Sequence, residues 1–359
     1  MRELKPQADN IKRVVVRAPN WVGDAVMSIP ALRELRRLLP DARLILVARP
    51  GTADIFLAAD FIDDVVIYKR SGIASVWEQV RQWRRQRFDL AVLLQNAFEA
   101  ALIASLARVP MRVGYNTERR GFLLTTPLRL PDWKDQRHET FYYLNIVSEL
   151  ESLLCGTTSD DTIAPRFDLN VSLDRKQQAR VLLHEHGQRI DAPLVLLCPG
   201  SINSRAKRWP AERYAALGDR LTESGANVVL IGSPGEVEVS EEVCKHAQRQ
   251  PIVLTGKTTV AEVTALISIA DVLITNDTGP THIGAALQTP TLAIFGPTNP
   301  LTTYPMSPNA EIVRRPPDCA PCMLRDCPID HRCMTAITPD EVFERASALM
   351  ARQHAEVSA

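Results

Sequence analysis

The chain has 359 residues, of which 45% are hydrophobic and 23% are charged, and this length predicts two globular domains. The composition excludes a disordered chain, a fibrous repeat and a coiled coil. The formal net charge is zero, but residues 1–150 carry 23 Lys and Arg against 17 Asp and Glu, whereas the remainder carries 19 against 25. The sequence therefore predicts a basic first half and an acidic second half.

Membrane spans and secretion signals are both disfavoured. No apolar stretch approaches the ~18 residues of a membrane span, and the N-terminus, MRELKPQADN, lacks the apolar centre of a secretory signal. We therefore expect a cytoplasmic protein, at most peripheral to a membrane, with no nucleic-acid partner. The cysteine count of seven is odd, so a disulfide framework is not expected.

The first half alternates strand-like and helix-like patterns. A β-branched run at residues 14–16 precedes the loop 18–24, and apolar residues then recur with helical spacing up to residue 39. Further strand-like runs follow at residues 44–47, 65–68 and 90–94. Strands that alternate with helices predict a parallel, doubly wound sheet.

A polar, irregular stretch at residues 155–173 is typical of a linker. A second alternation follows it, with strands expected at residues 194–198, 227–231, 251–254, 272–275 and 292–295. We therefore predict an α/β protein with two Rossmann-like domains facing each other across a cleft, at residues 1–172 and 173–338. Ligands of such sheets bind beyond the carboxyl ends of the strands.

Three loops of the second half follow predicted strands and suit a nucleotide diphosphate. Residues 199–210 combine small and hydroxyl residues with the cationic cluster Arg205, Lys207 and Arg208. In residues 275–282, Pro280 stands where a helix should begin, which aims the positive helix end at the cleft. Glu236 follows another strand end and could accept hydrogen bonds from ribose hydroxyls.

Each of these loops also has a purely structural interpretation. The basic loop could be a solvated turn before a helix, Asp277 or Thr278 could simply cap one, and Glu236 could be a routine first-turn residue. Neither G-x-G-x-x-G after the first strand nor G-x-x-x-x-G-K-[ST] occurs. A nicotinamide dehydrogenase and a P-loop NTPase are therefore disfavoured.

Asp24 opens the first helix directly after Gly23, beyond the end of the first predicted strand. A carboxylate at that position could take the proton from an attacking hydroxyl group. The alternative is an acidic residue that only stabilises the helix dipole.

Three motifs together resemble those of glycosyltransferase family 9, the bacterial lipopolysaccharide heptosyltransferases. They are Asn20-Trp21-Val22-Gly23-Asp24, Lys207-Arg208-Trp209-Pro210, and the 275–282 loop followed by Gly296-Pro297-Thr298. The resemblance covers nearly the whole chain, from residue 14 to about residue 350. It implies the B-type glycosyltransferase fold, with residues 339–359 forming a C-terminal helix that packs back on the first domain.

The resemblance also implies an inverting, metal-independent transfer of L-glycero-D-manno-heptose from ADP-heptose to the inner core of lipid A. No cofactor is then required for catalysis. Asp24 would be the general base, Lys207 would neutralise the diphosphate and Glu236 would hold the ribose. The donor site would further include Asp277, Thr278, Gly279 and His282. The stretch 200–207 departs from the family pattern, so Ser201, Asn203 and Ser204 are weaker donor-site candidates.

The basic excess of the first half suits an anionic acceptor. We expect Arg112, Tyr115, Arg119 and Arg120 to bind acceptor phosphates and carboxylates. Residues 77–88, WEQVRQWRRQRF, combine arginines with two tryptophans and suit the anionic inner-membrane surface. The alternative is an amphipathic helix that packs Val76, Val80 and Trp83 inward.

A cysteine segment, residues 319–333, contains Cys319, Cys322, Cys327 and Cys333. Two close pairs of thiols resemble a structural zinc site, although the usual longer spacer between the pairs is missing. Reduced thiols that pack a loop, or thiols that pair on oxidation, are the alternatives.

Two other functions remain open at this point. The same fold could transfer another sugar from a nucleotide diphosphate, because donor-site motifs report the diphosphate better than the sugar. A non-catalytic nucleotide-sugar-binding protein is the third possibility.

Overall fold

The computed structural model describes residues 8–156 and 164–358. The chain divides into two compact units, Met1–Asp168 and Leu169–Ala359, and the domain boundary predicted at residue 172 lies four residues beyond the first. The expected linker is only partly described, because residues 157–163 lie outside the described residues.

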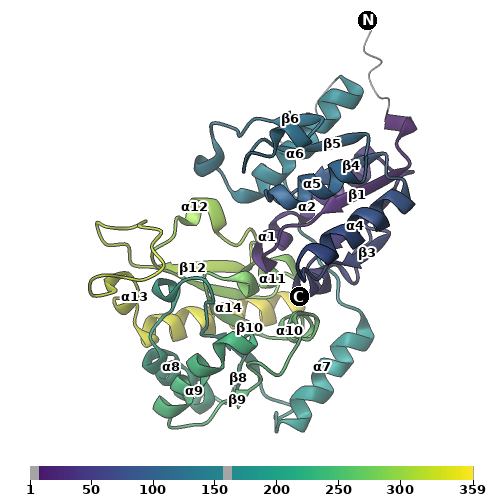
Figure 1. The fold of residues 1–359 in the computed structure, drawn as a ribbon. Coiled ribbons are helices and arrows are strands. Elements are labelled where there is room, and N and C mark those ends of the chain that lie inside the picture. Colours follow the sequence, from purple (N-terminus) through teal and green to yellow (C-terminus); the bar gives the residue numbers. More distant parts are fainter. Residues whose placement is uncertain (1–7, 157–163, 359) are drawn as a thin grey trace, which may run out of the picture. The chain divides into compact units, whose positions relative to one another are not determined.

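The first unit is built on a six-stranded parallel sheet in the order β3-β2-β1-β4-β5-β6 (Figure 1). Its central strand places Val15 opposite Ile45 on one side and Ala91 on the other. The β-branched run is fully buried, as expected for a strand covered on both faces. The strands are β1 (Arg13–Arg17), β2 (Arg43–Ala48), β3 (Asp64–Ile67), β4 (Leu90–Leu93), β5 (Met111–Tyr115) and β6 (Thr126–Leu128).

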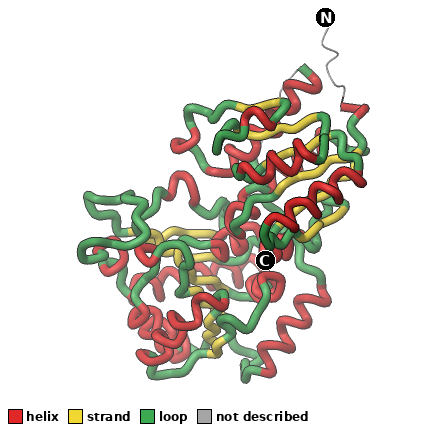
Figure 2. The backbone as a smooth tube through the Cα atoms, in the orientation of Figure 1, coloured by secondary structure: helices red, strands yellow, loops and turns green. Residues whose placement is uncertain are grey.

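Helices surround this sheet, as the tube drawing in Figure 2 shows. The α-helices are α1 (Val22–Met27), α2 (Ile29–Leu38), α3 (Pro50–Ala53), α4 (Ile73–Gln86), α5 (Phe98–Leu106) and α6 (Glu139–Cys155). Short 3-10 turns are η1 (Ala8–Asn10), η2 (Asp54–Phe56), η3 (Gly121–Leu123) and η4 (Lys134–Gln136).

The first predicted helix is interrupted. Its apolar spacing predicts one continuous helix up to residue 39, but the structure has α1 and α2 with a break at Ser28. Pro30 lies two residues beyond the break and has no N–H to bond the carbonyl of Val26, one turn earlier. The side chain of Ser28 donates instead to the carbonyl of Ala25 (2.7 Å).

The second unit repeats the architecture, with its strands in the order β12-β11-β10-β7-β8-β9. All neighbouring strands are again parallel, and Ile274 of the central β10 pairs with Leu197 and Leu292. The strands are β7 (Leu194–Cys198), β8 (Asn227–Leu230), β9 (Ile252–Val253), β10 (Val272–Asn276), β11 (Thr291–Phe295) and β12 (Ala310–Arg314).

The helices of the second unit connect these strands. They are α7 (Leu173–Glu185), α8 (Ala211–Glu223), α9 (Val237–His246), α10 (Val260–Ile267), α11 (Gly279–Ala286), α12 (Pro300–Thr303), α13 (Arg332–Thr335) and α14 (Pro339–Ser358), with 3-10 turns η5 (Arg205–Lys207) and η6 (Pro234–Glu236). Helix α14 packs on α8, β10 and β11 and buries Val342, Ala346 and Leu349. These side chains belong to the core of the second unit, and the packing on the first domain that the resemblance implied for this helix stays a prediction.

Among the described residues, none of the helices combines the length and the apolarity that a membrane span requires.

Candidate functional site

Four loops of the second unit leave the carboxyl ends of neighbouring strands. They follow β7, β8, β10 and β11 and contain, respectively, Lys207, Glu236, Asp277 and Thr298. Because the strands are parallel, these ends lie at one edge of the sheet. The predicted donor loops therefore come together in the folded chain.

Lys207 and Asp277 form an ion pair. The Nζ atom of Lys207 lies 2.8 Å from Oδ2 of Asp277 and 3.2 Å from its backbone carbonyl oxygen. Thr298 donates its hydroxyl to the same Oδ2 atom (2.7 Å). An ammonium group has three donors, and these contacts use two of them. Since the Lys207 side chain is 26% exposed while that of Asp277 is 4% exposed, the remaining donor can meet an anion.

Asn276 holds the surrounding loops in place. Its side-chain Nδ2 donates to the carbonyl oxygens of Pro199 (2.8 Å) and Gly200 (3.2 Å). Its Oδ1 accepts from the backbone N–H of Trp209 and the hydroxyl of Tyr214, both at 3.1 Å. This buried amide thus ties the end of β10 to both ends of the loop that follows β7.

Glu236 lies beside Gly200. Its Oε2 accepts from the backbone N–H (2.8 Å) and the hydroxyl (2.7 Å) of Ser233, which closes a capping box at η6. A Cβ atom at position 200 would lie only 2.1 Å from the other oxygen, Oε1. The absence of a side chain at Gly200 is therefore what allows the carboxylate to lie at the end of β7. Burial, with Glu236 as a second cause, raises the pKa of the Cys198 thiol to about 12.

Helix α11 begins at Gly279, with Pro280 in its first turn as predicted. Thr278 and Thr281 form a capping box at the start of this helix. The side chain of Thr278 accepts from the backbone N–H of Thr281, and the hydroxyl of Thr281 accepts from the backbone N–H of Thr278. His282 is buried within the same helix. The N-terminus of α11 follows Asp277 directly, so its positive end lies beside the Lys207 ion pair.

The predicted donor residues Ser201, Asn203 and Ser204 do not share one role. Ser201 is buried, and its carbonyl oxygen accepts two hydrogen bonds from Arg208 (3.1 and 2.9 Å). Ser204 is also buried and donates its hydroxyl to the carbonyl oxygens of Leu324 and Arg325, both at 3.2 Å. Asn203 is exposed. Of the three, only Asn203 has a side chain on the surface.

The four cysteines of the segment were the candidate ligands of a structural zinc site. Among the described residues, which include all four of its cysteines, no group of three or more His, Cys, Asp or Glu is placed to hold a metal ion. Burial and then the three other thiols raise the pKa of Cys333, so the four thiols lie in one neighbourhood. All seven cysteines of the chain are free thiols.

In the first unit, Asp24 lies half-buried in the first turn of α1. Its charge acts on Glu139 and on the buried Tyr143, both from the first turns of α6. Burial raises the pKa of Glu139; Lys134 opposes this shift and Asp24 adds to it. Neither Glu139 nor Lys134 was identified from the sequence, because Glu139 comes near Asp24 only through the packing of α6 against α1, and Lys134 acts on Glu139.

The side chains of the four residues predicted to bind the acceptor differ in their exposure to solvent. Arg120 is fully buried; its guanidinium donates to the carbonyl of Tyr115 (2.9 Å) and to Asn96 (2.9 Å), and burial lowers its pKa to about 10. Tyr115 is buried and donates to the carbonyl of Tyr142 (2.8 Å). Arg112 lies near the amino end of β5 and donates to the carbonyl of Leu123 (2.7 Å). Arg112 is half-buried, whereas Arg119, in the turn after β5, is exposed.

Arg17 is a buried cation that sequence reasoning missed. It ends β1, donates through Nε to Gln95 (2.8 Å) and lies 4.7 Å from the ring centroid of Tyr68. Burial lowers its pKa to about 10. The one available signal was a charged residue at the end of an otherwise apolar strand.

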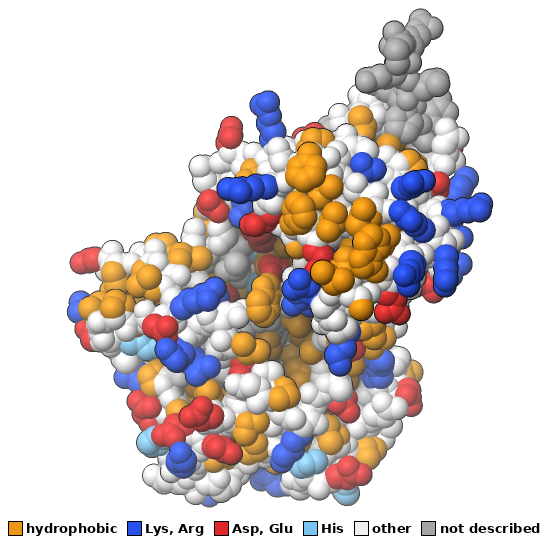
Figure 3. All heavy atoms as spheres, viewed as in Figure 1, with side chains coloured by type: hydrophobic (Ala, Val, Ile, Leu, Met, Phe, Trp, Pro, Cys, Tyr) orange, Lys and Arg blue, Asp and Glu red, His pale blue; other side chains and the backbone are white. Residues whose placement is uncertain are grey.

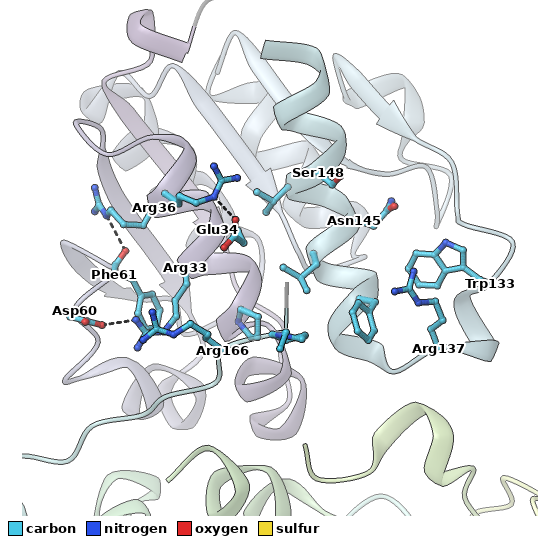
Figure 4. Close-up of a pocket in the computed structure, with 17 residues that line it drawn as sticks. Arg33, Glu34, Arg36, Asp60, Phe61, Trp133, Arg137, Asn145, Ser148 and Arg166 are labelled. Atoms are coloured by element: carbon cyan, nitrogen blue, oxygen red, sulfur yellow. Dashed lines mark hydrogen bonds and ion pairs between the residues drawn. The ribbon is translucent and has the colours of Figure 1, made fainter. Parts of the chain in front are cut away.

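A cavity of about 420 Å³ lies between α2 and α6 (Figure 4). Arg137 of its wall contacts the rings of Trp133 and Phe141, with its guanidinium 4.9 and 4.2 Å from their centroids. Arg33 pairs with Asp60 (3.2 Å) on the opposite side. None of the residues predicted for the site lines this cavity.

The family model of glycosyltransferase family 9 (heptosyltransferase) matches residues 76–332, well over half of the chain. The chain belongs to glycosyltransferase family 9. It is therefore a glycosyltransferase, and its donor-site candidates fall inside the matched residues, whereas Asp24 precedes them.

Full-length relatives agree with this family 9 assignment. Lipopolysaccharide heptosyltransferase 2 of Escherichia coli K12 is 27% identical over 96% of this chain and all of its own length. Lipooligosaccharide heptosyltransferase 2 of Haemophilus ducreyi is 29% identical over 94% and 99%. The solved E. coli ADP-heptose LPS heptosyltransferase II matches with a TM-score of 0.82 at 26% identity, over 95% of this chain and 99% of that one. The predicted fold class, two Rossmann-like domains of the B type, is confirmed.

Proposed function

We propose that this family 9 enzyme transfers L-glycero-D-manno-heptose from ADP-heptose to the inner core of lipopolysaccharide. The observation that carries the proposal is the cluster of Lys207, Asp277 and Glu236 at one edge of the second sheet. It offers a cation to a diphosphate and a carboxylate to a ribose. The names of the full-length relatives support the heptose and the lipopolysaccharide acceptor.

Asp24 is the general base in this proposal. Its carboxylate takes the proton from an acceptor hydroxyl while the hydroxyl oxygen attacks the anomeric carbon of the donor sugar. The bond from that carbon to the β-phosphate oxygen breaks, and ADP leaves with the electron pair. A single displacement inverts the anomeric centre and needs no covalent intermediate on the enzyme.

Lys207 and the N-terminus of α11 stabilise the departing ADP. Negative charge develops on the diphosphate as the sugar leaves, and prearranged donors act most strongly on such developing charge. These two groups take the part that a divalent ion plays in other sugar transferases. The proposed reaction therefore requires no metal ion.

Arg119 is the acceptor contact that we retain from the sequence prediction. Its guanidinium is free to form the paired hydrogen bonds that phosphates and carboxylates accept. Arg112, Tyr115 and Arg120 instead hold β5 and its following turn through the hydrogen bonds described above.

The same unit has a surface suited to an anionic membrane. Figure 3 shows hydrophobic side chains gathered over α4 and α5, with Lys and Arg beside them. The exposed apolar residues of these elements and η3 are Ile73, Trp77, Phe98 and Phe122, which we call the apolar patch. Residues 69–122 carry ten Lys and Arg against four Asp and Glu. We propose that this face rests on the anionic membrane that holds the acceptor.

The replacement Asp24→Asn tests the chemistry. Without a base, turnover should fall by about 10²–10⁴-fold, the usual contribution of general-base catalysis. ADP affinity should stay within about threefold, because the proposed donor contacts all lie in the second unit. Heptose transfer to a truncated core acceptor and ADP calorimetry measure the two effects.

Asp41→Asn, an exposed acid of the same unit, is the matched control and should behave as the parent. Parent-like turnover by the Asp24→Asn variant would rule out the mechanism. Consumption of a different nucleotide sugar in preference to ADP-heptose would favour the alternative donor, and a complete lack of turnover by the parent would favour a nucleotide-sugar-binding protein.

A further inference from the structure

The cysteine segment, residues 319–333, contacts the turn that carries Lys207. The backbone N–H of Ala206 donates to the carbonyl of Arg325 (2.9 Å), and the carbonyl of Ala206 lies 2.6 Å from Nε2 of His331. Because a carbonyl can only accept, Nε2 of His331 carries the proton in this contact. Both backbone polar groups of the residue before Lys207 are therefore bound by the segment.

Side chains on either side of Ala206 make further contacts with the segment. Ser204 donates its hydroxyl to the carbonyls of Leu324 and Arg325. Arg205 forms an ion pair with Asp326 (2.6 Å). The whole turn from residue 204 to residue 206 is thus held by residues about 120 positions later in the chain.

The segment also holds the loop after β11. The N–H of Met323 donates to the carbonyl of Pro297 (2.9 Å), next to Thr298. A Cβ atom at Gly296 would lie 3.2 Å from Sγ of Cys333, so the backbone of this loop packs closely on the segment. Thr298 in turn donates to the carboxylate that pairs with Lys207. The segment therefore contacts both the turn that precedes Lys207 and the loop that contains Thr298.

We propose that the cysteine segment is a brace for the donor diphosphate site, with His331 as its positioning residue. His331 acts through the Ala206 carbonyl, which fixes the backbone from which the Lys207 side chain extends. A turn that is ordered before the ligand arrives loses less conformational entropy on binding. The ligand class, a nucleoside diphosphate, rests on the proposed function; the ordering of residues 204–207 does not.

His331→Ala and His331→Gln test the brace in the full chain. The alanine variant should show at least about tenfold faster amide hydrogen exchange in residues 204–207 without nucleotide, since local opening is no longer opposed by the ring. Its Kd for ADP should rise about three- to tenfold, as expected for the loss of one hydrogen bond. The side chain of glutamine can donate to the same carbonyl, so the His331→Gln variant should keep part of the slow exchange and part of the ADP affinity of the parent.

A double-variant cycle separates positioning from general destabilisation. If His331 acts through Lys207, the replacement His331→Ala should add little to the loss of ADP affinity caused by Lys207→Ala. His246→Ala, a half-exposed histidine on α9 that pairs with Glu242, is the matched control and should change neither exchange nor affinity.

Unchanged exchange in residues 204–207 of the His331→Ala variant would overturn the brace, and so would fully additive losses in the cycle. A parent protein that binds ADP but transfers no heptose would instead contradict the proposed function alone. The exchange measurement needs no nucleotide, so the two failures are distinguishable.

Discussion

Gly200 shows how a single residue can decide the position of a functional carboxylate. Glu236 is held on one side by Ser233, so its Oε1 atom must lie where a side chain at position 200 would stand. The sequence indicated Glu236 as a ribose contact but gave no signal for Gly200, because the two meet only through the pairing of β7 with β8.

Gly200→Ala should therefore weaken ADP binding without unfolding the protein. The new methyl group would push the carboxylate away from its position, and we expect an increase in Kd of at least about fivefold, or ~1 kcal/mol. Calorimetric titration with ADP measures this change.

Gly235→Ala is the matched control, because a Cβ atom there would lie 3.9 Å from the hydroxyl oxygen of Ser233, an ordinary contact distance. Equal ADP affinities for the parent and the Gly200→Ala variant would show that Glu236 does not contribute to nucleotide binding.

The sequence of helix α4 allowed two interpretations, a membrane-facing surface and an amphipathic helix with an inward apolar face, and the structure is compatible with both. Its two tryptophans lie on different faces: Trp83 is in the core beside Phe88 (5.9 Å between ring centroids), whereas Trp77 is 48% exposed. The spacing of Val76, Val80 and Trp83 predicted an inward face, and the structure confirms it: Val80 and Trp83 are buried in the core, and the partly buried Val76 packs against it. The exposed Trp77 still belongs to the apolar patch.

The two tryptophans should respond differently to truncation. Trp83→Ala removes a buried ring and should cost about 3–5 kcal/mol of unfolding free energy. Trp77→Ala should cost less than ~1 kcal/mol, as is usual for surface positions. Urea unfolding of both variants measures the difference. Similar losses for the two would contradict the packing of α4.

The regular elements were largely predictable, and the contacts between loops were not. Central strands such as β1 and β7 have continuous apolar runs that are hard to mistake. Strands β5, β6 and β12 were missed because none of them has such a run. Ser204 was interpreted as a ligand contact because nothing local reveals that its hydroxyl bonds to residues 324 and 325.

For the molecule as a whole, the net charge of zero conceals a local excess of positive charge. The basic residues between 69 and 122 account for the positive balance of the first half. Apart from the buried Arg120, they lie on or near the elements that carry the apolar patch, so apolar contact and charge attraction would act at the same surface.

The protein should therefore bind vesicles that contain phosphatidylglycerol, and salt should weaken the binding because it screens surface charges. Phe122→Ser, at a position that is 77% exposed, should reduce the bound fraction several-fold, and Arg81→Glu with Arg85→Glu should reduce it further. Cosedimentation at low and high salt measures both effects.

Leu173→Ser is the control, since Leu173 is 83% exposed but lies in the second unit. If the Phe122→Ser and Leu173→Ser variants bound such vesicles equally well, the proposed membrane surface would be wrong. Transfer to a water-soluble truncated acceptor should be unaffected by any of these replacements.

The ion pair between Lys207 and Asp277 also bears on turnover. The ammonium group has a counterion before any nucleotide arrives, so the empty site does not leave a partly buried positive charge uncompensated. ADP can bind through the remaining donor of Lys207 while the pair persists, but the carboxylate of Asp277 offsets part of the attraction between the ammonium group and the diphosphate. The pair therefore lowers the affinity of the enzyme for its product ADP. We expect ADP to dissociate faster than it would from a site in which this lysine had no carboxylate partner.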